Sequence, residues 1–167
     1  MKLTDIASAE AWQQLAKGIY DKFRLNGGVI DNEGTVVHPP LGLWANKICP
    51  LVKGGNESRS VCASAQKGMS DNAGETRKTV IQRCDIGFTK FVVPVFSDDK
   101  FLGTVSGCGV LAEGNEADEF YISKLLNMKE KEIKELAKSV RSVSADDLNK
   151  AIKHVEDALK NILSQAR

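Results

Sequence analysis

The sequence predicts an α+β fold in which helices pack on one antiparallel sheet and a helical segment ends the chain. Two observations predict this class. The stretches 90–96 and 101–111 are rich in β-branched residues and are joined by the short turn 97–100, which is typical of a β-hairpin. Apolar residues recur at helical spacing over 7–24, and helical patterns dominate again beyond residue 115. Helices and strands that are grouped rather than strictly alternating indicate an antiparallel sheet.

The N-terminal part is expected to contain one helix and one hairpin. Residues 7–24 form the helix, with Ser8 as its cap, and the polar, glycine-rich stretch 26–28 ends it. β-branched residues on both sides of a central turn predict a short hairpin over 29–37. Two prolines directly after His38 end that hairpin, because proline cannot continue a ladder of hydrogen bonds.

The middle of the chain is expected to hold short helices and the long hairpin. Residues 43–53 and 57–69 are predicted as helices, and residues 78–84 as either a strand or a loop. Pro94 lies inside the first strand of the long hairpin, which suggests an edge strand or a bulge. Three glycines in the second strand are expected to let other groups approach the backbone closely.

The C-terminal part is expected to be helical throughout. Two segments, 116–127 and 129–139, precede a final helix that begins after Ser144. The final helix carries one apolar stripe, which consists of Leu148, Ile152, Val155, Leu159 and Ile162. Such a stripe serves to pack on the sheet, which we favour, or to pair with a second copy or a partner as a dimerisation module.

Length and charge limit the classes of function. The 167 residues predict a single domain, 1–167, and the 23 basic and 22 acidic residues leave a net charge of +1 without a basic block. Nucleic-acid binding is therefore not expected. No signal-peptide core and no apolar run of about 20 residues is present, so neither a leader nor a membrane span is expected. The chain is predicted to be cytoplasmic.

Four cysteines are the main candidates for chemistry: Cys49, Cys62, Cys84 and Cys108. Thiols in the cytoplasm stay reduced, so metal binding, redox chemistry or packing is expected rather than disulfides. Their wide spacing, without a C-x-x-C pair, favours packing on its own. Their polar or flexible neighbours favour a shared site instead, because a sheet with helices across it can bring distant positions together. Four thiolates at one point would suit zinc or an iron–sulfur cluster.

The segments NKICPLVKGGNESRSVCASAQKG and VIQRCDIGFTKFVVPVFSDDKFLGTVSGCGVL resemble the PocR sensory domain, a PAS-like module of bacterial transcription regulators, histidine kinases and chemoreceptors. The positions that match the family pattern are Cys49, Cys62, Cys84, Gly87, Pro94, Leu102, Gly103 and Gly109, and Cys108 matches a cysteine that some members carry. The chain departs from the pattern at Asp85, where the family has His, and at Val110, where it has Gln.

The resemblance implies a PAS-like sheet with helices packed on it and a non-enzymatic role in signal sensing. It implies recognition of small molecules, including diol-like or hydrocarbon-derived compounds. It also supports a shared role for Cys49, Cys62, Cys84 and Cys108 as ligands of zinc or a [4Fe–4S] cluster. The residues assigned to a ligand pocket are Trp44, Asp85, Phe88, Phe91 and Gly107. For each aromatic residue among them taken singly, a place in the core is the favoured expectation.

Two hypotheses remain open: a sensor whose cysteines bind a metal or cluster, and a metal-free sensor of a small organic ligand. A small-molecule or redox signal is the expected partner, together with a second copy or a downstream signalling protein. No kinase, methyl-accepting or DNA-binding segment is recognisable, so the chain is expected to be part of a larger receptor or to report through a partner.

Catalysis is not expected. Outside the final helix His38 is the only histidine, and no local signature of a cysteine hydrolase accompanies it. His154 is predicted to be solvated on the final helix. The position of Asp85 beside a turn favours a capping or solvated role for its carboxylate over that of a general base. The glycines from Gly103 to Gly109 lie inside a strand with no helix directly after it, so a nucleotide-binding loop is not indicated.

Overall fold

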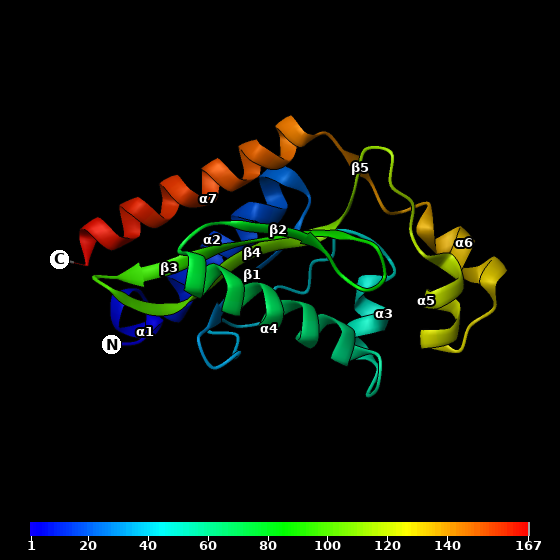
Figure 1. Ribbon diagram of the computed structural model, residues 1–167, viewed down its shortest axis with the longest axis horizontal. Coiled ribbons are helices and arrows are strands. Elements are labelled where there is room, and N and C mark those ends of the chain that lie inside the picture. The colour runs from blue at the N-terminus through cyan, green and yellow to red at the C-terminus, as the bar shows by residue number, and fades with distance from the viewer. Residues whose placement is uncertain (167) are drawn as a thin grey trace.

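The computed structural model describes residues 1–166 as one five-stranded sheet flanked by seven helices (Figure 1). The helices are α1 (Leu3–Ile6), α2 (Ala9–Phe23), α3 (Cys49–Gly54), α4 (Arg59–Thr76), α5 (Glu119–Leu126), α6 (Glu130–Ala137) and α7 (Ala145–Gln165). The strands are β1 (Asn26–Asp31), β2 (Val80–Arg83), β3 (Thr89–Ser97), β4 (Lys100–Ala112) and β5 (Ser142–Val143). The predicted α+β class, with an antiparallel sheet and a helical C-terminal segment, is confirmed. None of the described helices has the length and apolar character of a membrane span.

Strand β4 is the centre of the sheet. The antiparallel order is β1-β4-β3-β2, and β5 adds a short parallel pairing at the end of β4. Val105 of β4 lies opposite Val29 of β1 and Val93 of β3. Side chains alternate between the two faces of a strand, so this register decides which residues face the helices on each side.

Helices α2 and α7 cover one face of the sheet (Figure 1). Each helix begins at a serine: the backbone N–H of Ala11 donates to Ser8 Oγ at 3.2 Å, and that of Asp147 donates to Ser144 Oγ at 3.1 Å. The apolar stripe of α7 is buried in this core, which confirms that it packs on the sheet. His154 is partly buried with its ring centroid 5.5 Å from that of Phe23, so the expectation of a solvated histidine is wrong.

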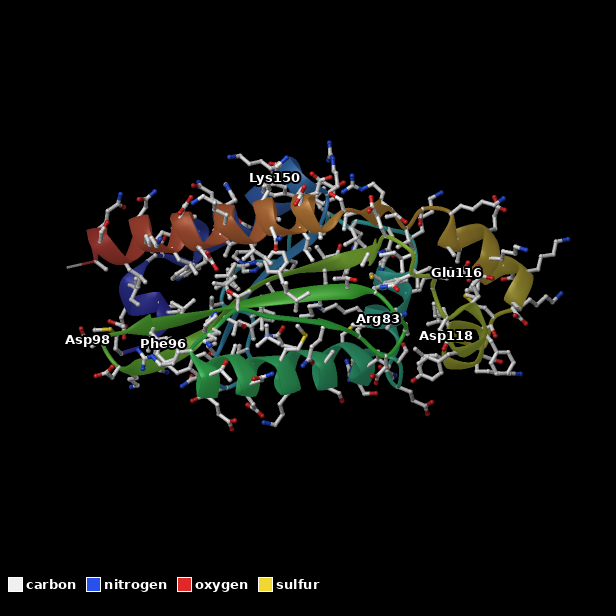
Figure 2. The ribbon with its side chains drawn as sticks, turned by 45° about the horizontal axis from the view of Figure 1, so that its top comes forward. Arg83, Phe96, Asp98, Glu116, Asp118 and Lys150 are labelled. Atoms are coloured by element: carbon white, nitrogen blue, oxygen red, sulfur yellow. The ribbon has the colours of Figure 1, made fainter. Side chains whose placement is uncertain are left out.

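Helices α3 and α4 lie on the other face, and α5 and α6 lie beyond the end of the sheet (Figure 1). A second core forms where these elements meet, and it contains Ile48, Val52, Val61, Ile86, Phe88, Leu111, Ile122 and Ile133. Two pairs of side chains mark the ends of the sheet in Figure 2. Arg83 and Asp118 lie where β2 meets α5, and Phe96 and Asp98 lie at the tip of the β3–β4 hairpin.

The predicted boundaries differ from the structure where tertiary contacts decide. The undecided stretch 78–84 contains strand β2, and the stretch 26–28 belongs to β1 rather than to a helix end. The helix predicted over 43–53 begins only at Cys49, because Asn46 Oδ1 accepts the backbone N–H groups of Ile48 and Cys49 at 2.8 Å and so holds the preceding residues in a turn.

Two other boundaries also moved. The helix predicted over 57–69 runs on to Thr76. In the hairpin predicted over 29–37, the returning segment makes one bridge, between Ile30 and Val36. β2 begins at Val80, which pairs with Val92, so Pro94 lies beyond the paired part of β3 and its edge is open there, as expected for a strand proline.

We predict that Gly27→Ala destabilises the fold by about 1–3 kcal/mol, because a Cβ there would lie 2.1 Å from the backbone oxygen of Ala16 in α2. The control is Gly18→Ala inside α2, where no atom lies within 4 Å of the added Cβ. That change is expected to stabilise the protein by about 0.5–1 kcal/mol through helix propensity. Urea unfolding of both variants measures the difference, and equal effects would contradict the close packing of α2 on β1.

Candidate functional site

The four cysteines come from four different segments. Cys49 begins α3, Cys62 lies one turn into α4, Cys84 follows β2, and Cys108 lies on β4. Cys49 is buried and the other three are half-buried. The first three contact the second core at the end of the sheet, which is where α3, α4 and the β2–β3 turn meet.

The thiols lie close enough to influence one another. Burial is the main cause that raises the pKa of Cys49, and the charges of Cys108, Cys62 and Cys84 raise it further. Burial also raises the pKa of Cys62, and the charge of Cys108 is the second cause that raises it. The pKa of Cys84 is raised by burial and by Cys108. Since such effects fade quickly with distance, the four predicted cysteines lie within electrostatic range of one another.

Hydrogen-bond donors point at three of the sulfurs. Asn46 Nδ2 donates to Cys49 Sγ at 3.2 Å and also to the Gly109 carbonyl at 2.9 Å. Asn26 Nδ2 lies 3.8 Å from Cys108 Sγ, at the limit for a bond to sulfur. These donors favour a charged sulfur over a neutral one.

The turn after Cys84 provides two further donors. The backbone N–H groups of Phe88 and Ile86 bond to the Cys84 sulfur and lower its pKa against the effect of burial. The turn closes because Gly87 adopts φ +94°, a left-handed conformation that glycine accommodates without strain. The N–H of Gly87 donates to the Cys84 carbonyl at 2.9 Å, and the Arg83 side chain donates to the Gly87 carbonyl at 3.2 Å.

The cysteines are free thiols, and their side chains are not set for a single ion. No disulfide joins them. Among residues 1–166, no group of three or more Cys, His, Asp or Glu side chains has the spacing that holds one metal ion. The arrangement therefore gathers four soft ligands without fixing them at the distances of a single-ion site.

Two polar residues flank Cys108 across the sheet. In the strand register Cys108 pairs with Asn26 of β1 on one side and with Lys90 of β3 on the other. Directly paired residues present their side chains on the same face. Gly109 makes the approach of Asn26 feasible, because a Cβ there would lie 2.5 Å from Asn26 Nδ2. The expectation that glycines of this strand permit close approach is confirmed.

A cavity of about 500 Å³ opens beside Cys108. Its floor is the sheet face that carries Asn26, Ser106 and Lys90, and its walls come from the 36–44 loop and from α3. His38 lines it as well, and His38 Nε2 accepts the backbone N–H of Val29 at 3.2 Å. This histidine thus faces the cavity rather than only ending a strand at the surface.

The residues assigned to a ligand pocket are dispersed. Trp44 lines the cavity and is 38% exposed. Asp85 is exposed in the turn after β2, and Phe88 lies in the second core. Phe91 lies in the first core, against Gly107, where a Cβ would be 2.6 Å from the ring. The period of two explains this placement, because Phe91 follows Lys90 and so points to the opposite face.

Sequence reasoning missed the polar partners of the cysteines and of the cavity. They are Asn26, Asn46, Lys53 and Lys90. One signal was available, since Lys90 interrupts a strand of otherwise buried apolar residues and is itself only 8% exposed. The asparagines gave no such signal. The sulfur partner of Asn26 lies on β4, and that of Asn46 lies at the start of α3, after a turn.

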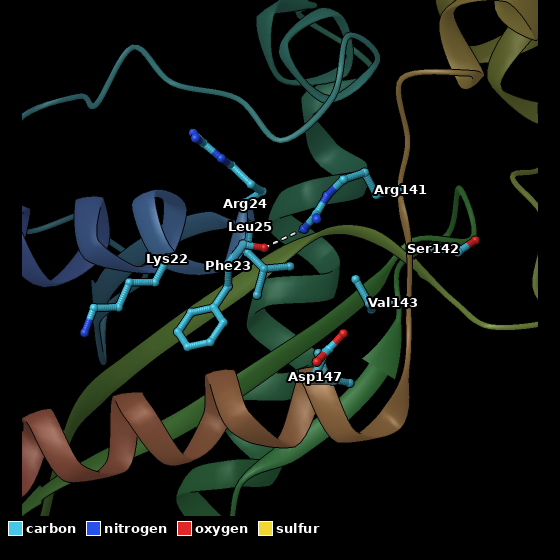
Figure 3. A pocket seen from close by; sticks show the side chains of 9 residues that line it. Lys22, Phe23, Arg24, Leu25, Arg141, Ser142, Val143 and Asp147 are labelled. Atoms are coloured by element: carbon cyan, nitrogen blue, oxygen red, sulfur yellow. Dashed lines mark hydrogen bonds between the residues drawn. The ribbon is translucent and has the colours of Figure 1, made fainter.

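A second cavity, of about 330 Å³, lies between the end of α2 and the start of α7 (Figure 3). Its basic side chains include Arg24 and Arg141. The Arg141 guanidinium donates to the Phe23 carbonyl at 2.6 Å and so satisfies a free acceptor at the end of α2. The Arg141 carbonyl accepts the N–H of Leu111 at 2.8 Å, so this residue joins α2 to β4 and has a structural role.

We predict that the reduced, metal-free protein loses stability as pH rises above about 8.5, the ordinary thiol pKa. Unfolded thiols ionise there, whereas the raised pKa keeps Cys49 protonated in the folded state. The folded state then holds more protons, so the free energy of unfolding falls with pH, by about 1.4 kcal/mol per pH unit for a fully protected thiol. Urea unfolding at about pH 7 and about pH 10 measures the fall. Cys49→Ala should reduce it by up to about 2 kcal/mol, and an unchanged fall would contradict the assignment.

The family model described as "Sensory domain found in PocR" matches residues 5–167. No curated protein and no solved structure matches the chain. The match covers nearly the whole chain and includes all four cysteines and every element from α2 to α7. The chain therefore belongs to the PocR family of sensory domains.

Proposed function

We propose that this domain senses a redox or ligand signal through an iron–sulfur cluster or a metal ion held by its four cysteines. The mutual proximity of Cys49, Cys62, Cys84 and Cys108, which come from four segments, carries the proposal. Family membership supplies the sensory role. Free thiols of this kind need a reducing compartment, which supports a cytoplasmic protein.

The hydrogen-bond donors support thiolate ligation. Cysteine sulfurs that bind metals or clusters are commonly tuned by N–H groups around them. Here Asn46 donates to Cys49, and two backbone N–H groups donate to Cys84. In a purely packing role these N–H groups would donate only to neutral thiols, which are weak hydrogen-bond acceptors.

The spacing of the thiols favours a cluster over zinc. A structural zinc ion holds four ligands at about 2.3 Å from sulfur, so its thiolates crowd around one point. Residues 1–166 hold no three ligands in such a group. An iron–sulfur cluster distributes its four cysteine ligands over several iron atoms and so accepts thiols that are further apart. When bound, the cluster would supply an electron-accepting group that is sensitive to oxygen.

The positions of the cysteines suggest how the signal would leave the site. Cys49 and Cys62 sit on helices α3 and α4, whereas Cys108 sits on the central strand. Ligation would join both helices to the sheet. Oxidation or loss of the bound group would release them, because metal binding and folding are coupled. The helices would then repack relative to β4 and present a changed surface to a partner.

A metal-free sensor of an organic ligand is the second candidate. The cavity of about 500 Å³ beside Cys108 favours it, because small-molecule sites commonly have such volumes and a mainly apolar lining with a few polar groups. In this reading the cysteines are packing residues. The two candidates differ in metal content, which can be measured directly.

We predict that protein purified without oxygen is coloured and contains iron and acid-labile sulfide. The visible absorption spectrum and the iron, sulfide and zinc contents measure this. Cys62→Ser and Cys84→Ser should each lose most of the iron, because each removes one of four ligands. Asn46→Ala removes the donor to Cys49 together with the bonds of Asn46 to the backbone of Ile48, Cys49 and Gly109, so it should weaken retention of the bound group about 10–100-fold.

The matched control is Ser64→Ala, an exposed position two residues after Cys62 on α4. This variant should keep the wild-type metal content. Zinc in place of iron would select the metal-ion form of the proposal. A colourless protein without bound metal, with folded Cys→Ser variants that behave like the wild type, would sink the proposal and leave the organic-ligand sensor.

A further inference from the structure

Two lysines of the cavity have no acidic partner. Lys90 is 8% exposed and lines the cavity from the sheet, and Lys53 lines it from α3. The ion pairs of residues 1–166 involve other lysines and Arg77, and no hydrogen bond is formed by either ammonium group in that part of the chain. No Asp or Glu among the described residues lines the cavity.

A buried cation without a partner is unfavourable. Removing an ammonium group from water is unfavourable unless an anion or hydrogen-bond acceptors compensate. Lys90 is held there by its place in β3, where its neighbours on either side, Thr89 and Phe91, are buried in the folded core. The cavity beside it therefore has the charge of an anion-binding site.

The rest of the cavity is mainly apolar. Its walls include Trp44, Leu41, Leu43, Ile30 and Val36. The polar side chains are largely used within the protein. Asn26 Oδ1 accepts the N–H of Ala45 at 2.7 Å, and the His38 ring bonds to Val29 and Pro39. Ser106 Oγ makes only a long contact of 3.5 Å with the Gly28 carbonyl, so its hydroxyl is available to a bound molecule.

We propose that this cavity binds a small carboxylate with a short apolar body. The carboxylate lies at the ammonium groups of Lys53 and Lys90, and the apolar part packs against Trp44 and Leu41. This inference rests on the sensory role of the domain but not on a cluster. It names a ligand class that differs from uncharged diols and alcohols, since a neutral hydroxyl would leave the buried charge of Lys90 uncompensated.

The test compares acids with alcohols of the same shape. Butanoate and butan-1-ol, and benzoate and benzyl alcohol, are titrated by calorimetry into the protein as purified without oxygen and into chelator-treated, reduced protein. Each acid should bind at least about tenfold more tightly than its alcohol, because hydrogen bonds to charged groups are stronger than neutral ones. Binding should weaken as salt is added. Butanoate should also change the emission of Trp44, whereas Trp12 is fully buried on the other face of the sheet.

Variants identify the charges. Lys90→Met and Lys53→Met should each weaken butanoate binding about 10–100-fold, whereas Lys90→Arg should retain it. Lys160→Met, at an exposed position of α7 on the opposite face, is the control and should bind like the wild type. Lys53 is exposed, so its replacement leaves the fold intact and keeps the test valid if Lys90→Met does not fold.

Three results would overturn the inference. Equal binding of acids and alcohols would make the cavity a neutral-ligand site. The absence of binding by either acid would remove the site. If Lys90→Met loses its bound iron and the acids do not bind to the protein, Lys90 serves only the four cysteines. Iron content is measured on the same samples, so carboxylate binding by iron-free protein supports the inference even if the cluster proposal fails.

Discussion

The pairing of β4 with its neighbours is the constraint on which the rest of the structure depends. This 13-residue strand pairs with β1, β3 and β5 and separates the two faces of the sheet. On one face Gly107 leaves room for the ring of Phe91, which completes the core beneath α2 and α7. On the other face Cys108 stands between Asn26 and Lys90. A shift of one residue in this register would exchange the two sets of side chains and remove both the core and the site.

The cysteine group and the cavity share the neighbourhood of Cys108 and Lys90. The cations of Lys53 and Lys90 favour ionised thiols, because both lower the pKa of Cys62 against burial and the charge of Cys108. The same two lysines face the cavity. A bound anion would compete with the thiolates for these cations. On the two proposals above, binding of an anion and ionisation of the thiols would each change the electrostatic free energy of the other.

The second core connects the cysteines to the helices around them, so a structural change at the thiols would be transmitted through it. Cys49, Cys62 and Cys84 contact the cluster of apolar side chains where α5 and α6 meet the end of the sheet. Asn46 connects the start of α3 to the backbone of β4 through Cys49 and Gly109. A change at the thiols would therefore reach α3, α4 and the α5–α6 pair before it reached α2 and α7, which pack on the other face.

Local sequence determined the α+β class, the β3–β4 hairpin, the serine caps of α2 and α7 and the apolar stripe of α7, because each depends on neighbours a few residues apart. It also marked the four cysteines, although their spacing could not show that they converge. Tertiary structure alone decided that 80–83 forms a strand. It also decided that Asn26 and Lys90 flank Cys108 and that Phe91 faces the opposite core. These outcomes depend on strand register and on contacts between segments far apart in the chain, which no local pattern encodes.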